Sequence, residues 1–116
     1  MIIEGIEVED KATVFLASFF DPNTKAYRKK EMQGLRFKYL GATFYLHRGV
    51  VSGWGISEER TGAYVAGGRS RASALATFKN NITQRGLNEK SLAEAIRKAK
   101  KVYDETTIPR RTRPGG

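Results

Sequence analysis

Apolar and polar side chains alternate along much of the N-terminal half of the chain, a pattern typical of β-strands with one buried face. The clearest case is the stretch 35–39, in which Leu35, Phe37 and Tyr39 share one parity. The cationic Arg36 and Lys38 share the other parity, so we expect them to face solvent. This stretch therefore predicts a half-buried strand with a basic outer face.

Further strands are predicted on both sides of this one. Residues 2–8 predict a short N-terminal strand, and the nearly continuous apolar run 13–20 predicts a strand buried on both faces. The turn-forming residues 21–24 follow, and the polar, basic residues 25–34 predict an exposed loop. Short connections between successive β-patterns are typical of an antiparallel meander. Its remaining strands are predicted at 43–48, 53–58 and 63–66.

The periodicity changes to that of helices after residue 69. Ser70 is a suitable N-cap, and Gly86 is a suitable left-handed residue at the end of the first helix. Asn88 caps a second helix, in which Glu94 and Lys98 are spaced for an ion pair. The apolar face of the first helix is predicted to comprise Ala72, Leu75, Phe78 and Ile82, and that of the second Leu92, Ala95, Ile96, Ala99 and Tyr103.

These elements predict an α+β fold: an antiparallel β-meander of four to six strands packed against two C-terminal helices. We expect one domain over residues 1–105, because the length suits a single modest core. Residues 106–116 are predicted to be a flexible basic tail, since P-R-R-T-R-P-G-G offers nothing to bury.

Composition excludes several classes of protein. With 40% hydrophobic and 28% charged residues, the chain resembles a folded domain rather than a disordered one. It contains no cysteine and a single histidine, which excludes disulfides, thiolate sites and histidine clusters, so we predict no metal and no cofactor. No apolar run approaches the roughly 20 residues of a membrane helix, and no basic leader precedes an apolar stretch. A cytoplasmic protein without a membrane partner is expected.

The net charge of +9 points to a polyanionic partner. Residues 1–20 carry four acids and one cation, whereas residues 61–86 carry four cations and no acid. The positive excess therefore lies in the middle and the tail of the chain. The alternative is a charge excess that serves only solubility.

Cations in three regions are candidate contacts for a nucleic acid. The segment 67–71, Gly-Gly-Arg-Ser-Arg, opens a helix, where free backbone N–H groups and guanidinium groups suit an anion. Alternatively, its glycines only supply the backbone angles that a strand-to-helix connection needs. The segment matches no nucleotide-binding loop motif. The tail could act as a polybasic clamp or be merely a flexible end. The predicted contact residues are Arg36, Lys38, Arg48, Arg60, Arg69, Arg71, Arg110, Arg111 and Arg113.

Two other interpretations concern the remaining polar and aromatic residues. Tyr39, Tyr45 and Trp54 could contact bases or sugars, although aromatic residues of strands more often pack in a core. A small ribonuclease could combine His47 with Glu58 and arginines, but nothing in the sequence fixes these groups near one another. We therefore predict a protein that is not an enzyme.

The order of strands and an alanine-rich helix in residues 35–82 is similar to that of AP2-type DNA-binding domains. The resemblance lies in residues 41–48, 54–58 and 63–78. That family, which includes the arm-binding domains of tyrosine recombinases, inserts a three-stranded sheet into a DNA groove. The resemblance implies DNA contacts at Arg36, Lys38, Arg48 and Arg60. The N-terminal strands and the second helix of this chain have no counterpart in the AP2-type fold.

Two hypotheses of function follow. The first is a nucleic-acid-binding module, with DNA favoured over RNA, that contacts the phosphate backbone through a basic sheet face and the 67–71 helix start. The second is a small accessory protein of phage or plasmid type that binds and regulates or inhibits a host protein. It is motivated by the absence of a sequence-reading motif and by the acidic strip at residues 4–10.

Overall fold

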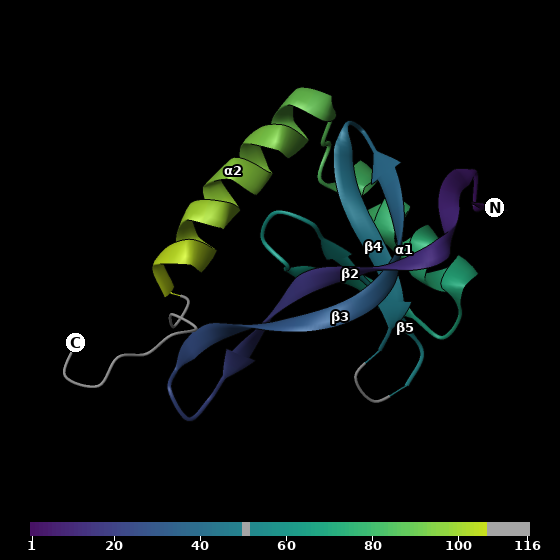
Figure 1. The fold of residues 1–116 in the computed structure, drawn as a ribbon. Helices are drawn as coiled ribbons and strands as arrows, with labels where there is room; N and C mark the ends of the chain where they lie inside the picture. The colour runs from purple at the N-terminus through teal and green to yellow at the C-terminus, as the bar shows by residue number, and fades with distance from the viewer. Residues whose placement is uncertain (50–51, 107–116) are drawn as a thin grey trace.

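A computed structural model describes residues 1–49 and 52–106, which form one antiparallel sheet and two helices (Figure 1). Each strand pairs with the next along the chain, so the spatial order is the sequence order. The predicted α+β meander with two C-terminal helices is confirmed. The elements are β1 (Ile2–Ile3), β2 (Ile6–Asp21), β3 (Ala26–Tyr39), β4 (Ala42–Arg48), β5 (Trp54–Glu58), β6 (Tyr64–Gly68), α1 (Arg71–Gln84) and α2 (Glu89–Thr106).

The first departure from the sequence prediction is a long two-stranded ribbon. The prediction of a loop at 25–34 is wrong, because β3 begins at Ala26 and pairs with β2 from Asp21 back to Ala12. A tight turn joins the strands: the Lys25 N–H donates to the Asp21 carbonyl, and the Asn23 N–H donates to the Asp21 carboxylate. The ribbon projects from the rest of the sheet, so polar residues fit either of its faces (Figure 1).

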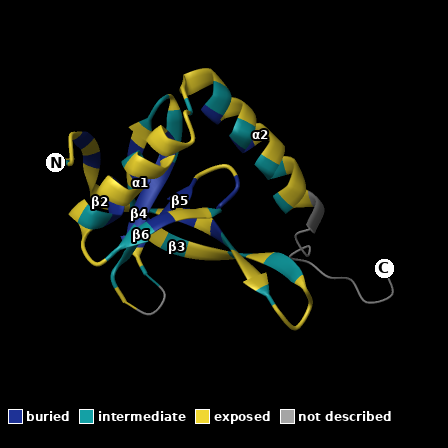
Figure 2. Cartoon of the chain, turned by 180° about the vertical axis from the view of Figure 1, so that it is seen from behind, coloured by how far each residue is buried: buried dark blue, intermediate teal, exposed yellow. Residues whose placement is uncertain are grey.

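The second departure concerns the run 13–20, which was expected to be buried on both faces. Phe15 and Ala17 are buried, but Val14, Leu16, Phe19 and Phe20 are exposed. Much of the ribbon is correspondingly exposed in Figure 2. The physical reason is that no helix covers this part of β2 in the described chain. The apolar run therefore predicted a strand correctly, but the prediction that the strand is buried on both faces is wrong.

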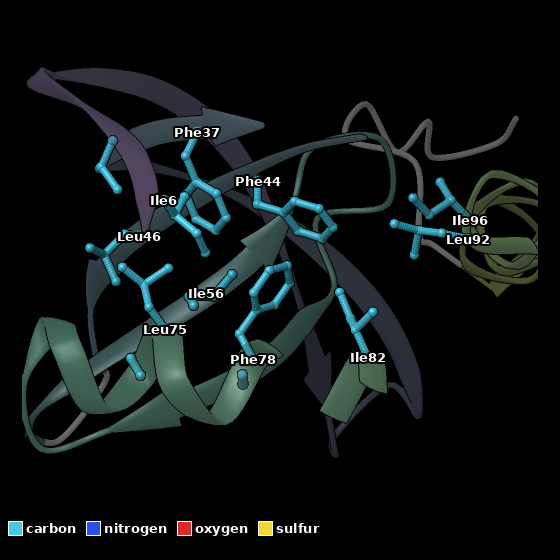
Figure 3. Packing of buried hydrophobic residues seen from close by; sticks show 13 residues of the cluster. Ile6, Phe37, Phe44, Leu46, Ile56, Leu75, Phe78, Ile82, Leu92 and Ile96 are labelled. Atoms are coloured by element: carbon cyan, nitrogen blue, oxygen red, sulfur yellow. The ribbon is translucent and has the colours of Figure 1, made fainter. Parts of the chain in front are cut away.

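The main core lies between the sheet and the two helices (Figure 3). Phe78 of α1 is buried against the rings of Phe37, Tyr39 and Phe44, with centroids 4.7 to 5.5 Å apart. α1 covers β5 and β6, whereas α2 packs against β3 and β4. Ala72, predicted on the buried face of α1, is exposed, and Ala74 is buried instead.

The predicted helix ends are confirmed. The Ser70 hydroxyl accepts from the Ser73 N–H at 3.0 Å, and the Asn88 side chain accepts from the Ser91 N–H at 2.8 Å. Gly86 has a φ of 65°, as expected of a left-handed residue at the end of α1. The ion pair of Glu94 is formed with Arg97, one position before the predicted Lys98.

A second, small cluster lies on the sheet face opposite the helices. Phe15 of β2 stacks on Tyr45 of β4, with centroids 4.5 Å apart and planes inclined by 5°. The intervening strand carries Gly34, where an added Cβ would lie 3.0 Å from Tyr45 and 3.1 Å from Phe15. Glycine therefore allows the two rings to meet across β3. The sheet curls around this cluster until the Ser18 N–H of β2 donates to the Gly62 carbonyl of the β5–β6 loop.

Candidate nucleic-acid interface

Two of the predicted contact residues meet at a single tryptophan. Arg48 ends β4, and Trp54 begins β5 directly opposite it. The guanidinium carbon of Arg48 lies 4.9 Å from the centroid of the Trp54 ring, and that of Arg71 lies 5.5 Å from it. Both distances are within the range of cation–π attraction. The indole thus holds together two cations that are 23 residues apart in the sequence. We call Arg48, Trp54 and Arg71 the arginine–tryptophan cluster.

The strand-to-helix connection brings Arg71 to this place. Trp54 pairs with Gly68, the last residue of β6. At Gly68 an added Cβ would lie 2.4 Å from the Ser73 hydroxyl and 2.6 Å from the Ala74 nitrogen. Only glycine lets the end of β6 approach the first turn of α1 this closely. The Ser70 cap then starts the helix at once, so that Arg71 is its first residue.

A shallow hollow of about 500 Å³ adjoins the cluster. Ser52, Gly53, Gly68 and Arg69 line it, so backbone groups and one guanidinium surround an open space. Gly68 and Arg69 come from the connection that leads into α1, and Gly53 directly precedes Trp54. Arg69 is exposed beside this hollow. The connection thus carries cations on both sides of the Ser70 cap.

Most of the predicted cations have no acidic partner in the described part of the chain. Ion pairs between side chains there engage Arg28, Arg36, Arg97 and Lys100 only. Lys38, Arg48, Arg60, Arg69 and Arg71 form none among these residues, and all five are exposed. Their charge is therefore available to an external anion.

Three predicted contacts lie apart from the arginine–tryptophan cluster. Arg36 is paired with Glu9 at 2.9 Å, and this carboxylate raises the pKa of the guanidinium. Lys38 is two residues further along the same face of β3. Arg60 lies in the β5–β6 turn, at the other end of the hairpin from Trp54, where its backbone N–H donates to Glu58. Arg110, Arg111 and Arg113 lie outside the described residues.

His47 and Glu58, the groups considered for a ribonuclease, do not form a common site. His47 is buried on the face of the second cluster, between Phe15 and Ser57. Its Nδ1–H donates to the Arg48 carbonyl, which leaves Nε2 to accept from the Ser57 hydroxyl. Burial lowers the pKa of this imidazole, which favours the neutral form.

Glu58 is buried on the other side of the sheet, since it pairs with Phe44 of the main core. Its carboxylate accepts from the backbone N–H groups of Arg60 and Thr61 and from the Thr61 hydroxyl. These bonds fix the β5–β6 turn, so the structure gives Glu58 a role in shaping the hairpin. No group of metal-ligating side chains occurs among the described residues.

The sheet face that an AP2-type domain would insert into DNA is partly covered in this chain. Tyr45 and His47 lie on that face of β4, and Phe15 packs over both rings. Tyr64 lies over Gly55 and Gly67 on the same side. On this face of β3, Lys38 is exposed, whereas Arg36 is paired with Glu9.

Comparison with known proteins adds no relative: no protein family, curated protein or solved structure matches the chain. Within the described residues, no helix has the length and apolar character needed to cross a bilayer.

Sequence reasoning did not place Trp54 between Arg48 and Arg71. The spacing of 48, 54 and 71 follows no helical or strand period, so the sequence offered no signal for the cluster. It depends on β-pairing between β4, β5 and β6 and on the tight start of α1.

Proposed function

We propose that this protein binds nucleic acid through the phosphate backbone, at the arginine–tryptophan cluster and the adjoining Arg69. The observation that carries the proposal is the geometry of two guanidinium groups held at 4.9 and 5.5 Å from one indole. A guanidinium donates in a planar fork that suits phosphate oxygens, and stacking on an aromatic ring reduces the freedom lost on binding. The pair thus resembles a preorganised phosphate clamp.

The charge around the cluster supports the same interpretation. The run from Thr61 to Gly86 contains four cations and no acid, and it includes the whole connection into α1. A nucleic acid lying over this end of the sheet would meet Arg48, Arg69 and Arg71 without an opposing carboxylate of that run. Lys38 and the tail arginines would supplement it with sequence-independent attraction.

The test is a titration of labelled DNA and RNA oligonucleotides of the same sequence, single-stranded and duplex, over a series of salt concentrations. The key variant is the double substitution Arg48→Gln with Arg71→Gln. Two lost phosphate contacts should reduce the slope of log K against log salt by about 1.4 for single strands and about 1.8 for duplex DNA. Fluorescence of Trp54, the single tryptophan of the chain, gives a second readout at the site itself.

The matched control removes the same two charges elsewhere. Arg28→Gln with Arg97→Gln changes two arginines whose charge is already balanced by Asp21 and Glu94. We expect this control to bind nearly as the wild type does. Equal losses in the two double variants would show that only net charge matters, and absence of binding at low salt would refute the proposal.

A further inference from the structure

The tyrosine that begins β6 is exposed and yet held in place on the sheet. Tyr64 is 60% exposed, whereas Tyr45 and His47 on the same sheet face are each 4% exposed. Its ring lies over two glycines that pair with each other across β5 and β6. A Cβ added at Gly55 would lie 2.5 Å from Tyr64 Cε2, and one added at Gly67 would lie 1.7 Å from the Tyr64 hydroxyl. Glycine at both positions therefore leaves room for this ring.

A ring that is both fixed and open to solvent is suited to stacking against a flat partner. The glycines hold one side of the Tyr64 ring, and the imidazole of His47 lies beside it, with centroids 6.4 Å apart and planes inclined by 64°. Because the ring is already positioned, a partner that covers it immobilises little that was free before. Which flat partner fits is decided by the charge around the ring.

The surroundings of the ring favour a flat group that carries a negative charge. The hydroxyl end of the ring lies over Gly67, and the next residue, Gly68, lines the hollow together with Arg69. The whole segment 61–86 contains no acid. Glu59 lies at the turn of the hairpin, and its carboxylate already accepts from a tyrosine hydroxyl at 3.1 Å. A nucleotide combines a flat base with a phosphate and so matches both the ring and the neighbouring cation.

The ring and the arginine–tryptophan cluster lie on opposite faces of the same hairpin. Trp54 packs against the main core on the helix side of the sheet. Because side chains alternate along a strand, Gly55 faces the other side, as does the ring that covers it. Both features lie near one end of the hairpin, since Trp54 pairs with Gly68 and Gly55 pairs with Gly67. A nucleic acid that contacts both must therefore turn sharply around the end of two strands.

We propose that Tyr64 stacks on an unpaired base and thereby makes the site selective for single-stranded nucleic acid. The inference rests on the proposed function, which supplies the phosphate contacts. Inside a duplex the bases are stacked on one another, so their faces are closed to the ring. Duplex DNA is also stiff, with a persistence length of about 50 nm, and a sharp turn around two strands is costly for it. A single strand meets both requirements, because its bases can be splayed out and its backbone is flexible.

The key variant is Tyr64→Leu, measured by fluorescence anisotropy with labelled single strands of DNA and of RNA and with the duplexes of the same sequence. The wild type should bind at least one of the single strands more tightly than its duplex. Loss of one stacked base should weaken single-strand binding about 5- to 150-fold. Duplex binding and the slope of log K against log salt should both stay unchanged, because no phosphate contact is lost.

Two matched variants test whether the aromatic ring itself is responsible. Tyr64→Phe keeps the ring and should bind single strands as the wild type does. Phe20→Leu removes another exposed aromatic ring, 53% exposed on the ribbon, and should also bind as the wild type does. A loss in Phe20→Leu equal to that in Tyr64→Leu, or a Tyr64→Phe variant as weak as Tyr64→Leu, would contradict the stacking contact.

An abasic single strand separates this inference from the proposed function. Such a strand keeps its phosphates but has no bases, so the wild type and Tyr64→Leu should bind it equally. Weaker binding of the abasic strand by Tyr64→Leu would overturn the inference, because the substitution would then act on the phosphate contacts. So would duplex binding by the wild type that is as tight as its single-strand binding. If Tyr64→Leu binds ordinary single strands normally while Arg48→Gln with Arg71→Gln lowers the salt slope, the stacking inference fails and the phosphate site stands.

Discussion

The small cluster beneath the ribbon allows a sharp test of how β2 is held. Phe15 is 5% exposed. Its ring centroid lies 4.5 Å from that of Tyr45 and 5.4 Å from that of His47, and the ring packs over Gly34, which has no side chain to displace it. Replacing a buried phenylalanine by alanine costs about 3–5 kcal/mol in free energy of unfolding, from lost burial and from the cavity left behind. For a chain of 116 residues this corresponds to a fall in Tm of about 12–20 °C.

The matched control lies on the same strand. Phe19 has the same parity as Phe15 but is 44% exposed, so Phe19→Ala should cost only about 1 kcal/mol. Urea unfolding followed by circular dichroism measures both free energies. The substitution Phe15→Ala also uncovers one side of His47, so the pKa of its imidazole should rise toward the ordinary value, which NMR titration can follow.

The two readouts separate the possible outcomes. A large loss of stability together with a raised pKa of His47 would fit a ring that both fills the cluster and desolvates the imidazole. Similar losses for Phe15→Ala and Phe19→Ala would refute the reasoning, because they would mean that the second cluster contributes no packing of its own. An unchanged pKa of His47 would contradict the part that concerns desolvation.

Three further predictions concern single side chains. Because burial lowers the pKa of His47, the free energy of unfolding should fall as pH drops below about 6.5. In urea titrations at several pH values, His47→Gln should remove the part of this pH dependence that comes from the imidazole, and an unchanged pH dependence would refute the prediction. Glu58→Gln should cost about 2–3 kcal/mol in the same assay through weakened bonds to the β5–β6 turn, and a loss no larger than that of exposed Glu31→Gln would argue otherwise. Trp54→Leu keeps every charge but should weaken oligonucleotide binding about five- to tenfold in anisotropy titrations, and unaltered affinity would exclude the indole as a positioning group.

Local patterns were mostly reliable where one element alone decides the outcome, although Glu94 pairs with Arg97 rather than with Lys98. The alternation at 35–39, the Ser70 and Asn88 caps and the left-handed Gly86 all appear in the structure as predicted. Each depends on side-chain period or on hydrogen bonds within a few residues, which neighbouring elements barely affect. The register of the helix faces was also mostly predictable, with Leu75, Phe78, Leu92 and Ile96 buried.

Patterns that depend on distant partners were misleading. The basic residues 25–34 look like a loop, yet β2 pairs with them and makes them a strand. The apolar run 13–20 looks fully buried, yet only Phe15 and Ala17 are buried. They pack in one cluster with Tyr45, which Phe15 reaches across Gly34. Strand pairing and side-chain burial depend on other strands, so a local window of sequence does not determine whether a segment pairs or which of its residues are buried.

For the candidate site, the sequence determined the supply of cations and the tertiary structure decided which of them act together. The acid-free run 61–86 and the net charge of +9 are properties of the chain alone. The pairing of Arg48 with Trp54, and of Trp54 with Gly68, required the β4–β5–β6 meander. The fold also balanced the charge of Arg36 with that of Glu9. Charge is fixed by composition, whereas the distance between charges is fixed only when the strands have paired.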